Sequence, residues 1–283
     1  MTPPPLAASL VGLEVGPVVQ VIDARWLMAY AAGLGETAAC YFDTARPRGP
    51  AAHALFAVCY EWPAALALRA ALLDEAAAVR GVHLTHRLVV HRAPVAGDRL
   101  ATIARVAAIE RHRAGALVGV RLATVDATGA PVTTTDYGSL YRGVAVTGAA
   151  APVPASSSGT GREEAAGAEE EIAVAAHAAH VYTECARIWN PIHTDAAVAR
   201  AAGLPGPILH GTATLALAVG RLVVRDLDGV PGRVREVTAR FSGMVPLPAR
   251  LALRRRAPAG DRLAFDVTRP DGRAVLSGGV VVT

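Results

Sequence analysis

The chain repeats itself, and this repeat limits the folds that it can adopt. The run Arg92-Ala-Pro-Val-Ala-Gly-Asp-Arg-Leu100 returns, one residue shorter, as Arg256-Ala-Pro-Ala-Gly-Asp-Arg-Leu263. Gly49-Pro-Ala-Ala-His53 likewise matches Gly206-Pro-Ile-Leu-His210. Self-similarity of this kind predicts two copies of one structural unit.

A pair of tyrosines and aspartates gives a third match in the same order. Tyr30 precedes Asp43 by thirteen residues, and Tyr182 precedes Asp195 by thirteen residues. A chain of 283 residues is long enough for two domains of ordinary size. We therefore interpret the chain as a tandem duplication.

Each copy shows the same order of expected elements. Asp23 is a suitable N-cap for a helix at 24–34. The first copy should contain a short strand at 16–22, that helix, a long apolar helix at 55–79, and strands at 82–91, 99–110, 114–125 and 131–143. The second copy should contain helices at 174–188, 195–202 and 211–224, and strands at 232–241, 248–256, 261–268 and 274–282.

The two copies are separated by a segment of different composition. Residues 146–170 are mostly Ala, Ser, Gly, Pro and Glu and include no aromatic residue. This composition is typical of a flexible, exposed linker, and the acidic run Glu169 to Glu171 should face water. The expected domains are therefore 1–145 and 171–283, joined by a linker at 146–170.

The most informative stretch lies in the second copy, between 182 and 212. Asn190 is the only asparagine of the chain and stands directly before Pro191. A residue before proline is disfavoured in the α region, so the preceding helix should stop near Trp189. His193 should then lie in a tight turn, and Thr194 or Asp195 can cap the next helix.

This stretch resembles the MaoC-like family, which includes the (R)-specific enoyl-CoA hydratases (hydratase 2) and related 3-hydroxyacyl dehydratases. The residues that match the family pattern are Tyr182, Asn190, Pro191, Ile192, His193, Asp195, Gly206, Pro207, Ile208, His210 and Gly211. The resemblance implies an α+β fold, a double hot-dog in which each unit wraps an antiparallel sheet around a long central helix. It also implies that the second unit keeps the active site, while the first has a degenerate site and shapes the substrate tunnel.

The chain departs from the family pattern at the catalytic carboxylate. Ile188 stands where the family carries its Asp, and Arg187 stands where it carries Gly. In the first copy, Tyr41 takes the position of His193, but Glu36 stands opposite Ile188. The first copy therefore has a carboxylate where the second has none.

The expected chemistry is the reversible dehydration of a 3-hydroxyacyl thioester, or hydration of the 2-enoyl thioester, with His193 as the acid/base group. A base with a pKa near 7 suits removal of the α-proton, and Asn190 could hold the imidazole or the reacting oxygen. Free N–H groups at the start of a helix can stabilise the thioester oxygen. Gly211, Ile188, Pro207 and His210 complete the expected oxyanion and substrate-binding set.

Several of these residues also have simpler interpretations. His210 recurs as His53, which favours a role in fixing the start of the helix. Asp195 recurs as Asp43 and is interpreted as a cap. No metal site is expected: His83, His86 and His91 share one strand-like run, but their odd separations should put neighbours on opposite faces.

The composition limits the classes of partner that the chain is expected to bind. Lysine is absent, so all 28 basic residues are arginine, and the formal net charge is +4. The arginines are scattered and aromatic residues make up only 5%, which argues against nucleic-acid binding. No apolar run approaches the ~20 residues of a membrane span, and no signal peptide is evident, so we expect a cytoplasmic protein.

The expected partner is acyl-CoA or an acyl carrier protein, whose phosphopantetheine carries the substrate, with no cofactor. The chain is expected to be a pseudo-dimeric monomer or a homodimer. Two alternatives remain open. Because Ile188 replaces the acid, His193 could instead run a proton shift, as an isomerase, epimerase or cyclase. The chain could also be a non-catalytic acyl-binding or assembly partner.

Overall fold

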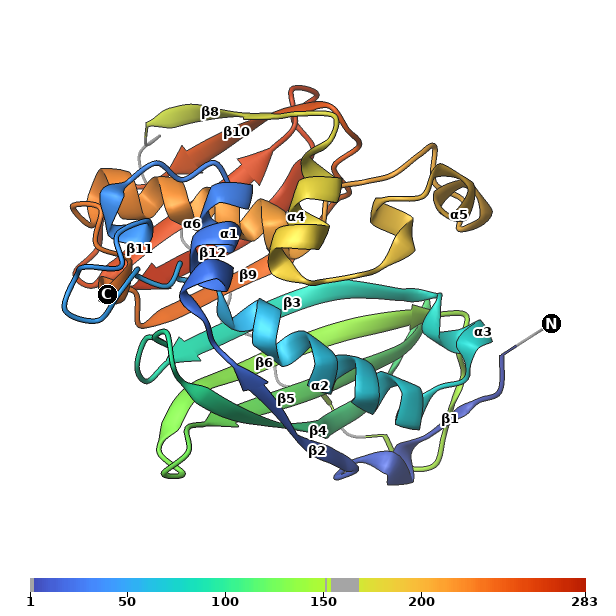
Figure 1. Cartoon of the computed structure of the whole chain (residues 1–283). Helices are drawn as coiled ribbons and strands as arrows, with labels where there is room; N and C mark the ends of the chain where they lie inside the picture. The colour runs from blue at the N-terminus through green and yellow to red at the C-terminus, as the bar shows by residue number, and fades with distance from the viewer. Residues whose placement is uncertain (1–2, 151, 154–167) are drawn as a thin grey trace.

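The fold is one continuous ten-stranded sheet with a palindromic strand order (Figure 1). In the computed structural model, which describes residues 3–150, 152–153 and 168–283, the order is β2-β4-β5-β6-β3-β9-β12-β11-β10-β8. Read inward from the two edges, the halves are β2-β4-β5-β6-β3 and β8-β10-β11-β12-β9. In both halves the strands follow the same order relative to their order in the sequence: first, third, fourth, fifth, second. This is the arrangement that a tandem duplication predicts.

The N-terminal unit supplies five of these strands. They are β2 (Glu14–Val21), β3 (Gly81–Val90), β4 (Arg99–His112), β5 (Gly115–Val125) and β6 (Pro131–Arg142). The central helix α2 (Ala57–Leu72) packs on β2, β4 and β5. α1 (Ala24–Gly33) begins at Asp23, whose Oδ1 accepts the Trp26 N–H at 2.7 Å, as expected of an N-cap.

The C-terminal unit repeats this plan. Its strands are β8 (Glu169–Val174), β9 (Glu236–Phe241), β10 (Ala249–Arg255), β11 (Arg262–Thr268) and β12 (Ala274–Val282). Its helices are α4 (Ala178–Ala186), the short α5 (Ala196–Ala201) and the central α6 (Gly211–Asp226). Figure 1 shows α1 and α4 side by side, and contacts join them.

The two units meet at antiparallel strands β3 and β9, where His86 pairs with Ala239. The larger hydrophobic core runs through both units and includes residues of α1, α2, α4 and α6. At its centre the hydroxyl oxygens of Tyr30 and Tyr182 lie 3.5 Å apart, so the paired tyrosines of the repeat face each other. A second core belongs to the N-terminal unit alone.

Three expectations about elements are corrected. The predicted helix at 55–79 is broken, because Asp74 caps a separate turn, α3 (Glu75–Ala78), by accepting the Ala77 N–H at 2.8 Å. The strand β8 was not predicted. It pairs with β10 and begins at Glu169, inside the expected linker, and it takes the place of the start of the helix expected from 174. At the linker's other end, β7 (Val146–Thr147) pairs with β1 (Leu6–Ala7). Residues 151 and 154–167 of the linker lie outside the described residues.

His83 and His86 also differ from expectation. A bulge between His83 and Thr85 shifts the register of β3, and the two imidazole centroids lie 5.5 Å apart instead of on opposite faces. Burial lowers the pKa of both side chains, to about 4 for His83 and about 3 for His86. None of the helices in the described part of the chain is long and apolar enough to cross a membrane.

Candidate active site

The loop that carries the motif begins where α4 ends. Arg187 adopts a left-handed conformation with φ 58°, and the Ile188 N–H returns to the Thr183 carbonyl at 3.1 Å. Asn190 is extended (φ −141°, ψ 111°), as a residue before proline should be. A single 3-10 turn, η3 (Pro191–His193), then places His193 at its last position.

His193 is held in one orientation by the backbone. Its Nδ1 lies 2.8 Å from the Ile208 carbonyl oxygen. A carbonyl can only accept, so Nδ1 carries the proton and Nε2 keeps a free lone pair in the neutral ring. Burial lowers the pKa of His193 to about 4, although the bond to Ile208 opposes the shift. The ring is therefore a neutral imidazole at pH 7, with Nε2 available as a base.

His210 lies directly against this ring. The two imidazole centroids are 3.7 Å apart and the planes are 27° from parallel. His210 Nε2 lies 3.3 Å from the Thr183 hydroxyl. Burial, and secondly His193, lower the pKa of His210 to about 2, so this ring is neutral too. His210 is the N-cap residue of α6, although its side chain makes no capping bond.

The start of α6 lies beside the two imidazoles, because His210 directly precedes Gly211. The N–H groups of the first turn precede the first bond of the helix, from Thr214 N–H to the His210 carbonyl at 3.0 Å. They are suited to stabilising a developing oxyanion. A Cβ at Gly211 would lie 3.0 Å from the ring of Phe241, so this glycine makes room for Phe241.

The other expected site residues have different environments in the structure. Asn190 is half-buried, and its carbonyl accepts the His193 N–H at 3.1 Å, while its side chain does not cap η3. Ile188 is 4% exposed and belongs to the core that spans both units. Pro207 is half-buried and directly precedes Ile208, the residue that orients His193. Asp195 caps α5 through the Ala197 N–H at 2.7 Å, as expected.

Comparison with known proteins agrees with the fold. Residues 159–261 match the family described as MaoC like domain, and residues 9–135 match the FAS1-like dehydratase domain region. The chain has a double hot-dog fold, and its C-terminal half carries the match to the MaoC like domain. The crystal structure of a MaoC-like dehydratase from Phytophthora capsici is similar over 97% of this chain and 96% of that chain, with a TM-score of 0.81 and 20% identity. A Mycobacterium tuberculosis structure described as a double hot-dog fold covers 96% of this chain and 95% of its own, with a TM-score of 0.62 and 18% identity.

Curated relatives match shorter segments. The enoyl-CoA hydratase ChsH3 of Mycobacterium tuberculosis is 38% identical over 91 residues, which are 31% of this chain and 32% of that protein. Across the curated relatives, the chain covers between 3% and 32% of their length. Another relative is the fatty acid synthase subunit beta of Aspergillus oryzae. It is 43% identical over 81 residues, which are 28% of this chain and 4% of that protein.

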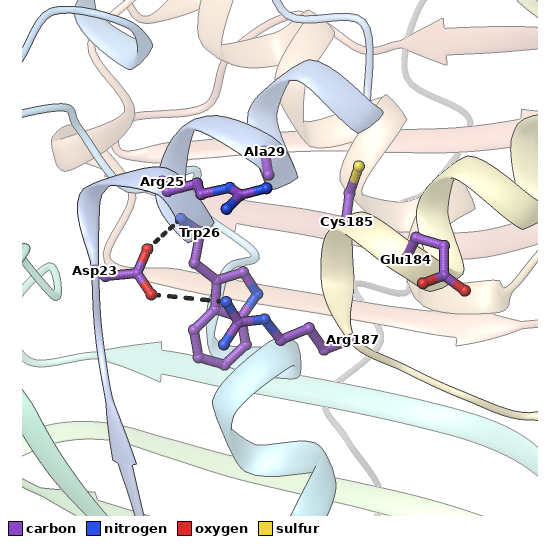
Figure 2. Close-up of a pocket in the computed structure, with 7 residues that line it drawn as sticks. All are labelled: Asp23, Arg25, Trp26, Ala29, Glu184, Cys185 and Arg187. Carbon is purple, nitrogen blue, oxygen red and sulfur yellow. Dashed lines mark hydrogen bonds and ion pairs between the residues drawn. The ribbon is translucent and has the colours of Figure 1, made fainter.

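The MaoC-like domain has an arginine where the family has glycine, and the structure shows what it contacts. The Arg187 guanidinium lies 4.1 Å from the centroid of the Trp26 ring and 3.6 Å from the Asp23 carboxylate (Figure 2). These residues line a surface groove of about 660 Å³ between α1 and α4, together with Arg25, Ala29, Glu184 and Cys185. A left-handed non-glycine residue costs roughly 1–2 kcal/mol, and cation–π contact can offset part of that cost.

Arg187 was noticed in the sequence only as a departure from the family. The contact with Trp26 joins two residues 161 positions apart (187 − 26), on the equivalent helices of the two units. No local pattern points to it. The positive φ is the structural sign that the side chain at this position matters, because glycine would adopt that conformation without strain.

Proposed function

We propose that the C-terminal unit catalyses the reversible hydration of a 2-enoyl thioester to a 3-hydroxyacyl thioester, carried on coenzyme A or on an acyl carrier protein. His193 is the acid/base group. The observation that carries the proposal is the bond from His193 Nδ1–H to the Ile208 carbonyl, which leaves Nε2 as a free base beside the start of α6. The matches to the MaoC-like domain and to enoyl-CoA hydratases support the substrate class.

In the dehydration direction, His193 Nε2 takes the α-proton and the electron pair of the C–H bond moves toward the thioester carbonyl. Its oxygen gains negative charge, which the N–H groups at Gly211 and the next residues of α6 can stabilise. The imidazolium then gives its proton to the β-hydroxyl as the C–O bond breaks, and water leaves. One imidazole performs both transfers if the proton and the hydroxyl depart from the same face.

The buried Ile188 fits this single-residue scheme and has a consequence for rate. No carboxylate at that position raises the pKa of His193, whose value of about 4 makes Nε2 a weak base and its conjugate acid a strong one. Each pKa unit is worth about 1.4 kcal/mol. Removal of the α-proton should therefore be slow and protonation of the hydroxyl fast, compared with an imidazole of ordinary pKa.

The test is mass spectrometry of 2-enoyl and 3-hydroxyacyl thioesters incubated with the protein, with His193→Ala in parallel. We expect wild type to add or remove one water and His193→Ala to lose this activity by at least ~100-fold, the usual size of an acid/base contribution. His177→Ala is the matched control, since His177 is exposed in the same unit and makes no side-chain cap to α4.

Three outcomes would contradict the proposal. Unchanged turnover in His193→Ala would remove His193 from the mechanism. A product of unchanged mass, formed with deuterium uptake that depends on His193, would instead establish an isomerase or epimerase. Binding without turnover across a broad panel would establish an acyl-binding protein.

A further inference from the structure

The N-terminal unit contains the carboxylate that the C-terminal unit lacks. In the repeat, Glu36 stands opposite Ile188, and His53 stands opposite His210. The structure brings these two N-terminal residues together: Glu36 Oε1 lies 3.6 Å from His53 Nε2. The pair joins the loop after α1 to the segment before α2.

The His53 ring, like the His193 ring, is held through Nδ1 by a hydrogen bond to the backbone. The two rings differ in that Nε2 of His53 is a donor, whereas Nε2 of His193 is a base. His53 Nδ1 accepts the Leu55 N–H at 3.1 Å, so the neutral ring carries its proton on Nε2. Nε2 faces Glu36, and it has no hydrogen-bond partner among the described residues although His53 is only 2% exposed. A buried donor without a partner is uncommon in folded proteins and calls for a water or ligand.

Tyr41 adds a second buried polar group at this place. It is 1% exposed, and its hydroxyl also lacks a partner in the described part of the chain. Its ring centroid lies 6.1 Å from that of His53. Burial, and secondly Glu36, raise the pKa of Tyr41, so the phenol is neutral. Two unpartnered side chains, each more than nine-tenths buried, therefore lie beside the Glu36 carboxylate.

The central helix of the opposite unit makes room for that carboxylate. Gly220 lies inside α6, where glycine is unfavourable relative to alanine. A Cβ at Gly220 would collide with Glu36 Oε1 and lie 3.3 Å from His53 Nε2. The Glu36 side chain is 11% exposed, so part of it reaches solvent.

We propose that Glu36 and His53 form a second acid/base centre, in the N-terminal unit, for the enolisation of an acyl thioester. Glu36 takes the α-proton as the C–H bond breaks, and the His53 Nε2–H donates to the carbonyl oxygen that receives the electron pair. The proton on Glu36 exchanges with solvent and returns to the α-carbon. The substrate class rests on the function proposed above, but this step needs no loss of water and no group of the C-terminal site.

The test is deuterium exchange at the α-carbon of a saturated acyl-CoA in heavy water, followed by mass spectrometry. Saturated butyryl-CoA cannot be hydrated or dehydrated, so the assay is separate from the test of the proposed function. The variants are His193→Ala, His193→Ala with Glu36→Gln, and His193→Ala with Glu14→Gln as the matched control. Glu14 is exposed on β2, and among the described residues its ion pair is a loose one with Arg105, at 3.6 Å.

We expect His193→Ala to keep exchange above the rate without protein, and the addition of Glu36→Gln to bring it to that rate. Glu14→Gln should change nothing. Gly220→Ala in the His193→Ala background changes no titratable group and should also abolish exchange, which guards against misfolding caused by Glu36→Gln. Exchange at the background rate in His193→Ala, or exchange indifferent to Glu36→Gln, overturns the inference. If the wild type shows no hydration activity but the exchange that depends on Glu36 is present, only the proposed function is overturned.

Discussion

The low pKa of His193 gives the sharpest prediction about activity. The fall from 6.5 to about 4 comes from burial and is opposed by the Ile208 carbonyl. It corresponds to about 3 kcal/mol of added cost for the imidazolium at about 1.4 kcal/mol per unit. The free base that the mechanism needs therefore persists far below neutral pH, and kcat/KM should fall on the acid side only near pH 4.

A lowered and an ordinary pKa of His193 predict clearly different activities at pH 5.5. With a pKa of about 4, about 97% of His193 is neutral there, whereas an ordinary pKa of 6.5 would leave about 9% neutral. The assay is kcat/KM for a 2-enoyl thioester from pH 4.5 to 8, with circular dichroism at each pH to confirm that the protein stays folded. His177→Ala should show the same profile as wild type, because His177 is exposed and outside the site. An acid limb centred between pH 6 and 7 in the folded wild type would refute the buried, carbonyl-bound imidazole as the base.

Three further changes test the packing around the two sites. Burial raises the pKa of Glu61 to about 7 from 4.5, so the stability that its protonated form contributes is present below about pH 4.5 and lost as pH rises through 7. Glu61→Gln should therefore be more stable than wild type by up to about 3 kcal/mol at pH 8 and nearly equal to it at pH 4.5, measured by urea unfolding. Gly220→Ala should displace the far end of the flexible Glu36 side chain but change stability by no more than ~1 kcal/mol, because the cost of that shift is offset by the gain in helix propensity; a loss above ~3 kcal/mol would contradict this reasoning. Arg187→Ala should cost ~1 kcal/mol more than Arg187→Gly in the same assay, because both lose the Trp26 contact but only glycine relieves the left-handed backbone.

The architecture could be predicted because a repeat and a regular strand pattern leave little freedom. The sequence matches predict two equivalent units, and the sheet has a palindromic order in which β3 and β9 join the halves. Alternating runs such as β4 and β5 are long, so their existence was clear from sequence. The helix at 24–34 was also predictable, because Asp23 supplies the cap.

The errors occurred where a local signal had two meanings. Glu169 and Glu171 are exposed, as expected of an acidic run, but the run was assigned to the linker, whereas these residues form an edge strand in which Arg250 and Arg254 of β10 pair with the glutamates. An edge strand with one exposed face tolerates such charges. Asp74 lies within the long helix expected at 55–79, whereas its carboxylate caps a new turn.

The site could be located from sequence but its chemistry could not. The motif placed His193 in a turn before a helix, and the structure has it there. Which nitrogen acts depends on the Ile208 carbonyl, fifteen residues away, and the pKa depends on burial. Likewise Glu36 was visible as the residue opposite Ile188, but its approach to His53 is a tertiary contact that spacing does not encode.

The two repeated histidines show how a duplication lets one position acquire two environments. His210 lies against His193 and Thr183, and no carboxylate is paired with it in the described residues. His53 lies against Glu36 and Tyr41 instead. The difference extends to the helices, since Gly220 opens α6 beside Glu36 while α2 has Pro63 within it. A symmetric homodimer could not hold these two arrangements at once, because each change would appear in both copies. In one chain, an imidazole base and a carboxylate–imidazole pair can form in separate units of the same fold.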